Sequence, residues 1–268
     1  MYESYWGFKL KPFDNVPDPR FYFPSEEHEE ALMRLVYVIR NRKGAALLSG
    51  VYGCGKTLLT RAVLQQLEGD LYRVAKITNP RLDDMGLMKV CANAMGIPPE
   101  GKDKAGFLIA IENHLLEVDR DGKHTLVIVD EAHTLTHEGA LEEIRMLLNF
   151  QLEDRFLLTL LFVGQPELDR IIDANKQLSQ RIAMRYTIKP FDRVDTQGYV
   201  EHRVKTAGNL KSVFTSDALD LIHSRSGGIP RRINHICDIS LLVGFSAKDA
   251  QVSAELVEES VRSMGGGE

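Results

Sequence analysis

Gly50-Val51-Tyr52-Gly53-Cys54-Gly55-Lys56-Thr57 matches the phosphate-loop pattern G-x-x-x-x-G-K-[ST] at every defined position. An apolar run over residues 45–49 precedes it and a helical pattern over 56–67 follows it, which is the strand–loop–helix context that such a loop requires. Its glycines let successive backbone N–H groups curl around phosphate oxygens, and the N-terminus of the helix adds partial positive charge. The stretch therefore predicts a nucleotide-binding α/β fold.

The residues of this loop have distinct expected contributions to nucleotide binding. Lys56 is expected to reach the β- and γ-phosphates of ATP, and the Thr57 hydroxyl to bind Mg²⁺. Cys54 has two interpretations, a redox-sensitive thiol or a small residue at a variable position. We favour the second, because no activating neighbour beyond Lys56 is evident. The residues expected to contact ATP or ADP are Gly50, Val51, Tyr52, Gly53, Cys54, Gly55, Lys56, Thr57 and Leu58.

Two acidic residues, Asp130 and Glu131, follow the apolar run over residues 126–129. An acid at the end of a buried strand is costly unless it meets a cation. We expect Asp130 to hold Mg²⁺, directly or through water, and Glu131 to polarise the water that attacks the nucleotide. The alternative is an ordinary strand that ends in a polar turn. The phosphate loop upstream favours the functional interpretation, and the adjacent glutamate favours hydrolysis over binding alone.

Short apolar runs alternate with helical patterns through the first two thirds of the chain. Expected strands cover residues 45–49, 72–77, 125–130, 157–164 and 185–188. Expected helices cover residues 26–41, 56–67, 84–94, 105–118, 139–149 and 166–173. Strands that are apolar on both faces and alternate with helices indicate a parallel sheet that helices cover on both sides. We therefore predict a three-layer α/β/α sheet of the P-loop type.

The strand pattern ends after Pro190, which divides the chain into two predicted domains. Residues 1–190 are assigned to the α/β domain, with residues 1–24 as an extended segment because their prolines exclude regular helix. Residues 191–268 are predicted to form three or four helices, which make a small helical lid. Breaks between these helices are expected around Gly208, Gly227-Gly228 and Gly244. Residues 264–268 are expected to be a flexible end or linker stub.

The composition limits the class of protein. With 268 residues, 44% hydrophobic and 26% charged, the chain is neither disordered nor collagen-like, and its net charge of −5 does not predict bulk binding to nucleic acid or membrane. The three cysteines are widely spaced without a CxxC pair, which argues against a disulfide framework or zinc site. No secretory signal and no apolar run of roughly 20 residues is evident. We expect a cytoplasmic protein, or one peripheral to the inner membrane through partners.

Several further strings resemble those of a known family. They are Tyr5-Trp6-Gly7-Phe8, Lys11-Pro12-Phe13, Pro17-Asp18-Pro19-Arg20-Phe21, Asp130-Glu131-Ala132-His133, Val163-Gly164-Gln165-Pro166-Glu167-Leu168 and Gly228-Ile229-Pro230-Arg231-Arg232-Ile233-Asn234. With them, nearly the whole chain resembles the AAA+ branch of P-loop ATPases and, more specifically, the general secretion pathway protein A (ExeA-like) family. Relatives of that family include ATPases of mannose-sensitive haemagglutinin pilus biogenesis. Secretion-type members continue into a membrane span and a peptidoglycan-binding region, so we expect either a longer protein or a shorter branch.

The resemblance implies roles for residues outside the two nucleotide motifs. Gln165 falls at the sensor 1 position, where a polar group orients the attacking water; the alternative is a turn residue before the next proline. Arg231 resembles sensor 2, which reports the γ-phosphate from the lid, and the preceding Pro230 is expected to contact the nucleotide. Arg232 is expected to be a surface charge of the helix.

The resemblance also places an arginine finger before the fifth strand. Arg181 is preferred for this role, in which it would neutralise charge in the active site of a neighbouring subunit. Arg185 is the alternative, but it should already have entered the strand. The family further implies a homo-oligomeric ring, with a hexamer as one option, and an N-terminal segment packed against adenine.

Two functions of different class are compatible with these residues. The first is an ATPase that couples its nucleotide state to a protein partner in assembly of a cell-envelope secretion or pilus system. The second is a nucleotide-gated DNA-binding regulator of the transposition type, which is not favoured because residues 191–268 carry nine Lys and Arg against eleven Asp and Glu. A metal site at His133, His137 and Glu138 is not favoured over surface polar residues, because the spacing alone is weak.

Overall fold

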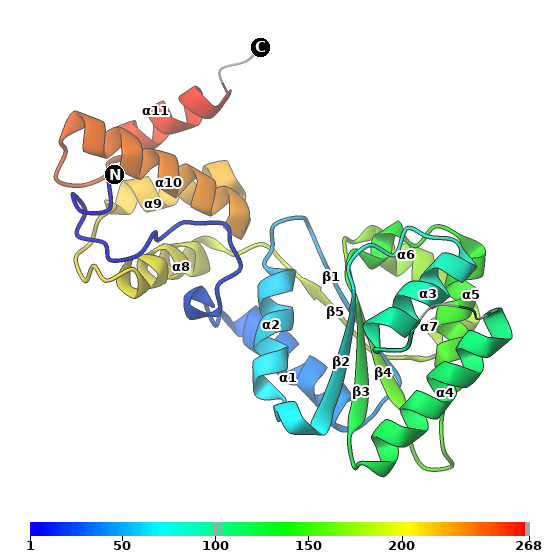
Figure 1. Ribbon diagram of the computed structural model, residues 1–268. Helices are drawn as coiled ribbons and strands as arrows, with labels where there is room; N and C mark the ends of the chain where they lie inside the picture. Colours follow the sequence, from blue (N-terminus) through cyan, green and yellow to red (C-terminus); the bar gives the residue numbers. More distant parts are fainter. Residues whose placement is uncertain (99–100, 102, 266–268) are drawn as a thin grey trace. The chain divides into compact units, whose positions relative to one another are not determined.

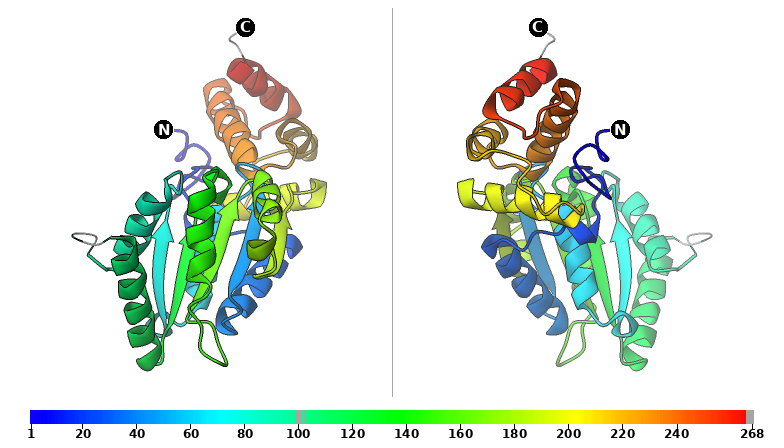
Figure 2. Two further views of the ribbon diagram at one scale, coloured as in Figure 1. Left: turned by 90° about the vertical axis from the view of Figure 1, so that its right-hand side faces the viewer. Right: turned by 90° about the vertical axis from the view of Figure 1, so that its left-hand side faces the viewer.

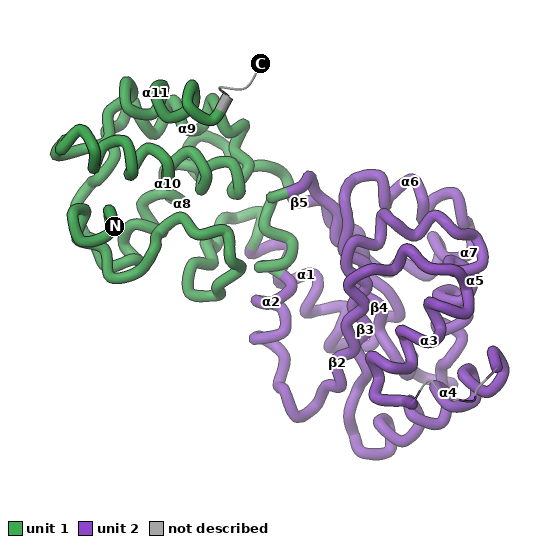
Figure 3. The backbone as a smooth tube through the Cα atoms, turned by 45° about the horizontal axis from the view of Figure 1, so that its top comes forward, with its two compact units in different colours: residues 1–28, 53–59, 189–268 green, residues 29–52, 60–188 purple. Residues whose placement is uncertain are grey.

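The computed structural model describes residues 1–98, 101 and 103–265, which divide into two compact units. One unit contains residues 29–52 and 60–188, and the other contains residues 1–28, 53–59 and 189–265 (Figure 3). We name them the sheet unit and the helical unit. Of the expected flexible tail, Met264 and Gly265 instead end the last helix, and residues 266–268 lie outside the described residues. In the part of the chain that is described, no helix is long and apolar enough to cross a membrane.

Within the described residues, the sheet unit is built on five parallel strands in the order β2-β3-β4-β1-β5 (Figure 1). Their bounds are β1 (Ala45–Gly50), β2 (Tyr72–Ile77), β3 (His124–Val129), β4 (Leu158–Gly164) and β5 (Ile182–Ile188). Every residue of β1, β3 and β4 is buried, as expected for strands that helices cover on both faces. The predicted parallel sheet is therefore confirmed.

Helices cover both faces of this sheet. They are α1 (Glu26–Arg40), α2 (Lys56–Gln66), α3 (Asp84–Ala94), α4 (Lys104–Arg120), α5 (Glu138–Leu147), α6 (Glu167–Ala174) and α7 (Lys176–Ser179). Helices α1 and α2 lie on one side and α3 to α7 on the other (Figures 1 and 2). Asp83 and Asp103 are the N-caps of α3 and α4, since their carboxylates accept the N–H of Gly86 at 2.7 Å and of Gly106 at 2.8 Å. The three-layer α/β/α prediction is confirmed.

The helical unit combines the last helices with the start of the chain. Its helices in the described residues are α8 (Arg193–Thr206), α9 (Ser216–Ser226), α10 (Pro230–Ala247) and α11 (Ala254–Gly265). Trp6, Phe8, Phe13 and Phe21 are buried in the same hydrophobic core as these helices. Residues 1–24, which we expected beside the nucleotide domain, therefore pack with the helical unit, because burial of their aromatic rings requires an apolar partner. They hold only a short 3-10 helix, Pro19–Phe21, in place of a fully extended segment.

One predicted boundary in the helical unit is wrong. Gly244 was expected to separate two helices, but it lies inside α10. A Cβ atom at this position would lie 2.9 Å from the indole ring of Trp6, so the glycine makes room for a buried tryptophan rather than a break. Trp6 Nε1 also donates to the Leu241 carbonyl at 3.0 Å in the same helix. The expected breaks near Gly208 and Gly227 are confirmed, since α8 ends two residues before the first and α9 ends directly before the second.

Strand β5 differs from the prediction in its start. It begins at Ile182, three residues before the expected Arg185, because these residues pair with β1 from Ala45 onward. Residues 182–184 are apolar but only half-buried or exposed, so pairing with a neighbouring strand extends the element beyond its buried part.

Buried His124 should make stability depend on pH. It begins β3, is 3% exposed, and its Nε2 lies 2.8 Å from Thr159 Oγ1. Burial, aided by Arg42, lowers the pKa of this imidazole from 6.5 to about 4. The neutral ring therefore contributes stability above pH ~6.5, and this contribution is lost as the pH falls towards the folded-state pKa, by roughly 2 kcal/mol at pH ~5.

Denaturant unfolding of wild type and His124→Gln at the two pH values measures this contribution. The glutamine keeps an amide near Thr159 but does not titrate, so the variant should lose about 2 kcal/mol less stability between pH ~7 and ~5 than wild type. Identical losses in the two proteins would contradict the assignment to His124.

Candidate nucleotide site

The sheet brings the ends of three predicted motifs to one edge. Strands β3, β4 and β1 are consecutive neighbours and parallel, so their carboxyl ends share that edge. Asp130 follows β3, Gln165 follows β4, and Gly50 ends β1 and opens the phosphate loop. The carboxyl edge of an open α/β sheet is also where such folds bind their ligands.

Asp130 is held in place by the neighbouring strand β2. Its backbone N–H donates to the Ile77 carbonyl at 2.8 Å, and its carboxylate lies 2.9 Å from Nζ of Lys76. The Asp130 side chain is 17% exposed. This half-buried carboxylate at the end of a strand thus meets a cation, as we expected, but the cation comes from a lysine that we did not predict. The signal for Lys76 was a cation at the penultimate position of the strand.

Glu131 has an unusual backbone conformation for a residue other than glycine. Its φ of 53° and ψ of 34° lie in the left-handed region, which costs a non-glycine residue roughly 1–2 kcal/mol. The Glu131 carbonyl accepts from the Thr134 N–H at 2.9 Å and from Thr134 Oγ1 at 2.8 Å, which offsets this cost. The side chain is 49% exposed and can reach water. Strained residues of this kind gather at functional sites.

His133 lies between Glu131 and Gln165. Its Nδ1 is 3.4 Å from the Glu131 carboxylate and accepts the backbone N–H of Gln165 at 3.4 Å. Its Nε2 is 3.1 Å from Nε2 of the Gln165 side chain. The interpretation of His133 as a surface residue is therefore wrong, because its side chain is only 16% exposed and bridges two predicted site residues. The available signal was its place two positions after Glu131.

The metal interpretation of His133 with His137 and Glu138 has no geometric support. Within the residues that the structure describes, no group of three or more His, Cys, Asp or Glu side chains is placed to hold a metal ion.

The phosphate loop turns through two glycines with positive φ, Gly53 at 88° and Gly55 at 90°. A Cβ atom at Gly53 would lie 2.8 Å from Cβ of Arg231, so only glycine fits this close approach. Lys56 begins helix α2, with Thr57 and Leu58 in its first turn. Backbone N–H groups in the first turn of a helix lack partners within the helix and favour an anion. The buried Cys54 side chain, 1% exposed, is not in the accessible setting of a redox sensor.

Within the helical unit, the start of α10 contacts the second half of the phosphate loop. Pro230 is the first residue of that helix, where its fixed φ is favourable, and the N–H of Arg231 donates to the Gly53 carbonyl at 3.2 Å. Arg232 is exposed, as expected for a surface charge of the helix. The structure thus brings the predicted sensor 2 motif to the second half of the loop.

The two candidate arginine fingers have different environments. Arg181 directly precedes β5 and donates to neutral acceptors, the Leu148 carbonyl at 3.2 Å and Asn149 Oδ1 at 3.5 Å. Arg185 lies within β5, as predicted, and its guanidinium is 2.8 Å from the Asp173 carboxylate. Arg185 already forms an ion pair with a carboxylate of its own chain. Arg181 is therefore the better candidate for an arginine that acts on a neighbouring subunit.

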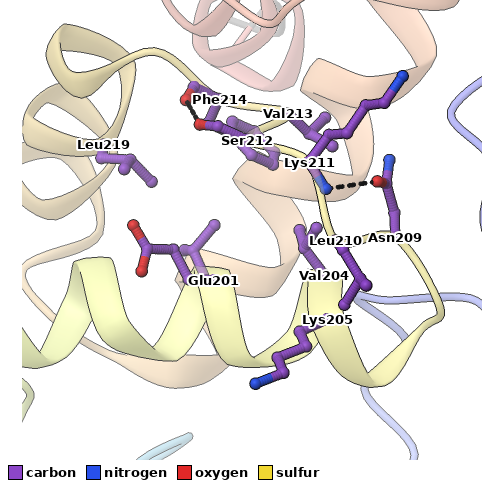
Figure 4. Close-up of a pocket in the computed structure, with 11 residues that line it drawn as sticks. Glu201, Val204, Lys205, Asn209, Leu210, Lys211, Ser212, Val213, Phe214 and Leu219 are labelled. Carbon is purple, nitrogen blue, oxygen red and sulfur yellow. Dashed lines mark hydrogen bonds between the residues drawn. The ribbon is translucent and has the colours of Figure 1, made fainter.

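A separate groove lies in the helical unit, away from these motifs in the sequence. Its volume is about 390 Å³, and α8 and the segment 209–214 provide most of its lining (Figure 4). The lining residues are Val200, Glu201, Val204, Lys205, Asn209, Leu210, Lys211, Ser212, Val213, Phe214 and Leu219. None of these is among the residues predicted for the nucleotide site.

Residues 39–172 match the family model described as AAA domain. The chain is also 38% identical over 250 residues to the general secretion pathway protein A of Aeromonas hydrophila. This similarity covers 92% of the chain and 45% of that relative, so the chain spans about half the length of the secretion protein.

Solved structures of ORC proteins share the fold. The Aeropyrum pernix ORC2 protein has a TM-score of 0.71 at 17% identity and covers 96% of this chain and 72% of its own. Drosophila ORC bound to DNA has a TM-score of 0.73 at 18% identity, covering 96% of this chain and 65% of its own. At such low identity these similarities describe the fold alone. The family match and the 38% identity mean that the chain belongs to the AAA domain family of P-loop nucleoside triphosphatases and is similar to general secretion pathway protein A.

Proposed function

We propose that this protein binds ATP with Mg²⁺, hydrolyses it to ADP and phosphate, and couples this cycle to assembly of a cell-envelope secretion or pilus system. The observation that carries the catalytic part is the cluster of Glu131, His133 and Gln165 at the ends of adjacent strands. A polarising carboxylate and a water-orienting amide beside the strand that opens the phosphate loop are the groups that hydrolysis requires.

The residues fit a magnesium nucleotide. The paired positive φ angles of Gly53 and Gly55 form a loop that phosphates can enter, and Lys56 follows at the start of a helix. The Thr57 hydroxyl and the Asp130 carboxylate supply oxygen ligands of the kind that Mg²⁺ prefers. Mg²⁺ would neutralise charge on the β- and γ-phosphates.

In this proposal each residue of the site has one role in ATP hydrolysis. Lys56 binds the phosphates, Glu131 takes a proton from the attacking water, and Gln165 orients that water. Gly50, Val51, Tyr52, Cys54, Leu58 and Pro230 complete the nucleotide contacts in this proposal. Arg231 senses the γ-phosphate from α10, whose first turn already contacts the loop through Gly53.

The biological role rests on the secretion relative. General secretion pathway protein A is similar over most of this chain, which supports a protein partner in envelope assembly rather than DNA as the target. The nine basic and eleven acidic residues in positions 191–268 also do not favour DNA. In this proposal the protein forms a ring, with a hexamer as one option, and Arg181 completes the site of the adjacent subunit.

Mixing two inactive variants tests action in trans. Arg181→Ala and Lys56→Ala should each lack ATPase activity, but a 1:1 mixture should recover about a quarter of the wild-type rate, because one type of mixed interface keeps both intact groups. Phosphate release is the measurement. Arg185→Ala is the matched control. It should be active by itself, because it keeps both Lys56 and Arg181, and adding Lys56→Ala should not raise its rate. If mixed assemblies form and no ratio of Arg181→Ala to Lys56→Ala restores activity, Arg181 does not act in trans.

A further inference from the structure

Two successive carbonyl groups of the phosphate loop meet donors from the helical unit. The Gly53 carbonyl accepts the Arg231 N–H at 3.2 Å. The Cys54 carbonyl lies 3.3 Å from Nε2 of His28. A loop that turns its N–H groups towards an anion turns these carbonyls away from it, and each then needs a donor on the outer side.

His28 lies in the first turn of α1 and is 5% exposed. Its Nδ1 is 2.8 Å from Oγ of Ser25, and its ring packs near those of Tyr22 and Phe191, with centroids 6.4 Å and 5.2 Å away. Ser25 is itself buried, at 3% exposure. The Ser25 hydroxyl and two aromatic rings therefore hold the imidazole in place, while its Nε2 faces Cys54.

The partners of His28 define its tautomer. A carbonyl can only accept, so Nε2 carries the hydrogen and donates to Cys54. In the neutral ring Nδ1 then accepts from the Ser25 hydroxyl. Burial lowers the pKa of His28, which favours this neutral form. One buried side chain thus links the start of α1 to the backbone of the loop.

We propose that His28 is a positioning residue for the phosphate loop: its Nε2–H holds the Cys54 carbonyl and so presets the following N–H groups for the phosphates. This inference rests on the proposed nucleotide site. Nε2 also lies 3.5 Å from where a Cβ of Gly55 would be, so the ring contacts the turn that precedes Lys56. Without this donor, the Cys54 carbonyl would lose its hydrogen bond to the imidazole, and the backbone that leads into Lys56 would be held less firmly.

Two amide variants separate the two ends of the imidazole. His28→Gln places an amide N–H near the position of Nε2 and keeps a donor for Cys54. His28→Asn reaches only the position of Nδ1, so it keeps the Ser25 contact and loses the Cys54 contact. If His28 served only to pack the helix start, the two variants would behave alike or asparagine would be the better replacement.

Calorimetric titration with Mg-ATP and with Mg-ADP measures the effect. We expect His28→Asn to weaken both affinities roughly 10-fold or more, and His28→Gln to stay within about 3-fold of wild type. His124→Asn is the matched control, because it removes a buried histidine of the sheet unit at the amino end of β3. Its thermal midpoint should fall while its nucleotide affinity stays unchanged.

The outcomes separate this inference from the proposed function. Wild type that binds neither nucleotide would remove the proposed site itself. Wild type that binds, with His28→Asn folded and equally tight, would overturn the role of His28 alone. Equal losses in the asparagine and glutamine variants, or a larger loss in glutamine, would also overturn it.

Discussion

Glu131→Gln should bind ATP with wild-type affinity but hydrolyse it about a thousandfold more slowly. Glutamine has the same shape but cannot accept a proton from the attacking water, and general-base catalysis of this kind contributes typically 10²–10⁴-fold. The side chain is 49% exposed, so the substitution leaves no buried group without a partner. The measurement pairs calorimetric ATP affinity with the steady-state rate of phosphate release.

A matched control removes the same charge elsewhere. Glu112→Gln, on the exposed side of α4, should keep the wild-type rate. A normal rate in Glu131→Gln would mean that water is activated by another group. A fall in ATP affinity equal to the fall in rate would instead indicate that Glu131 acts mainly in binding.

Lys56→Ala should weaken ATP binding roughly a hundredfold. The ammonium group follows the two turning glycines of the loop, and charge-assisted hydrogen bonds to phosphate are among the strongest that a side chain makes. Alanine favours a helix at least as well as lysine, so α2 should persist. Calorimetric titration with Mg-ATP measures the change, and thermal unfolding checks that the variant is folded.

The control for this prediction is Lys89→Ala on α3, which also removes one exposed cation from a helix. Its ATP affinity should match that of wild type. Unchanged affinity in Lys56→Ala would exclude the assignment of residues 50–57 as the phosphate loop.

Much of the fold followed from local patterns. Strand β2 and helix α3 have the predicted bounds, because apolar periodicity and flanking turn residues define them within their own segments. The same holds for the loop between β1 and α2, whose residues all lie close together in the sequence. Sequence patterns were sufficient to predict the bounds of elements whose ends do not depend on contacts with other elements.

The failures arose where distant residues meet. Gly244 signals a break when it is considered alone, yet it packs under Trp6, which lies more than 200 positions earlier. His133 and Lys76 were missed for the same reason, since their roles depend on Gln165 and Asp130 on adjacent strands. The aromatic N-terminal segment could be recognised from its composition, but not the helices against which it packs. The rings of this segment are buried against other side chains of the protein, at Trp6, Phe8, Phe13 and Phe21.

The most direct test of the central claim is the identity of the nucleotide recovered from the protein after incubation with Mg-ATP. Wild type should yield ADP, with phosphate released into solution, while Glu131→Gln should yield intact ATP. Chromatography of the denatured samples distinguishes the two nucleotides. Intact ATP on assembled wild type, or ADP in equal amounts on both proteins, would contradict the account.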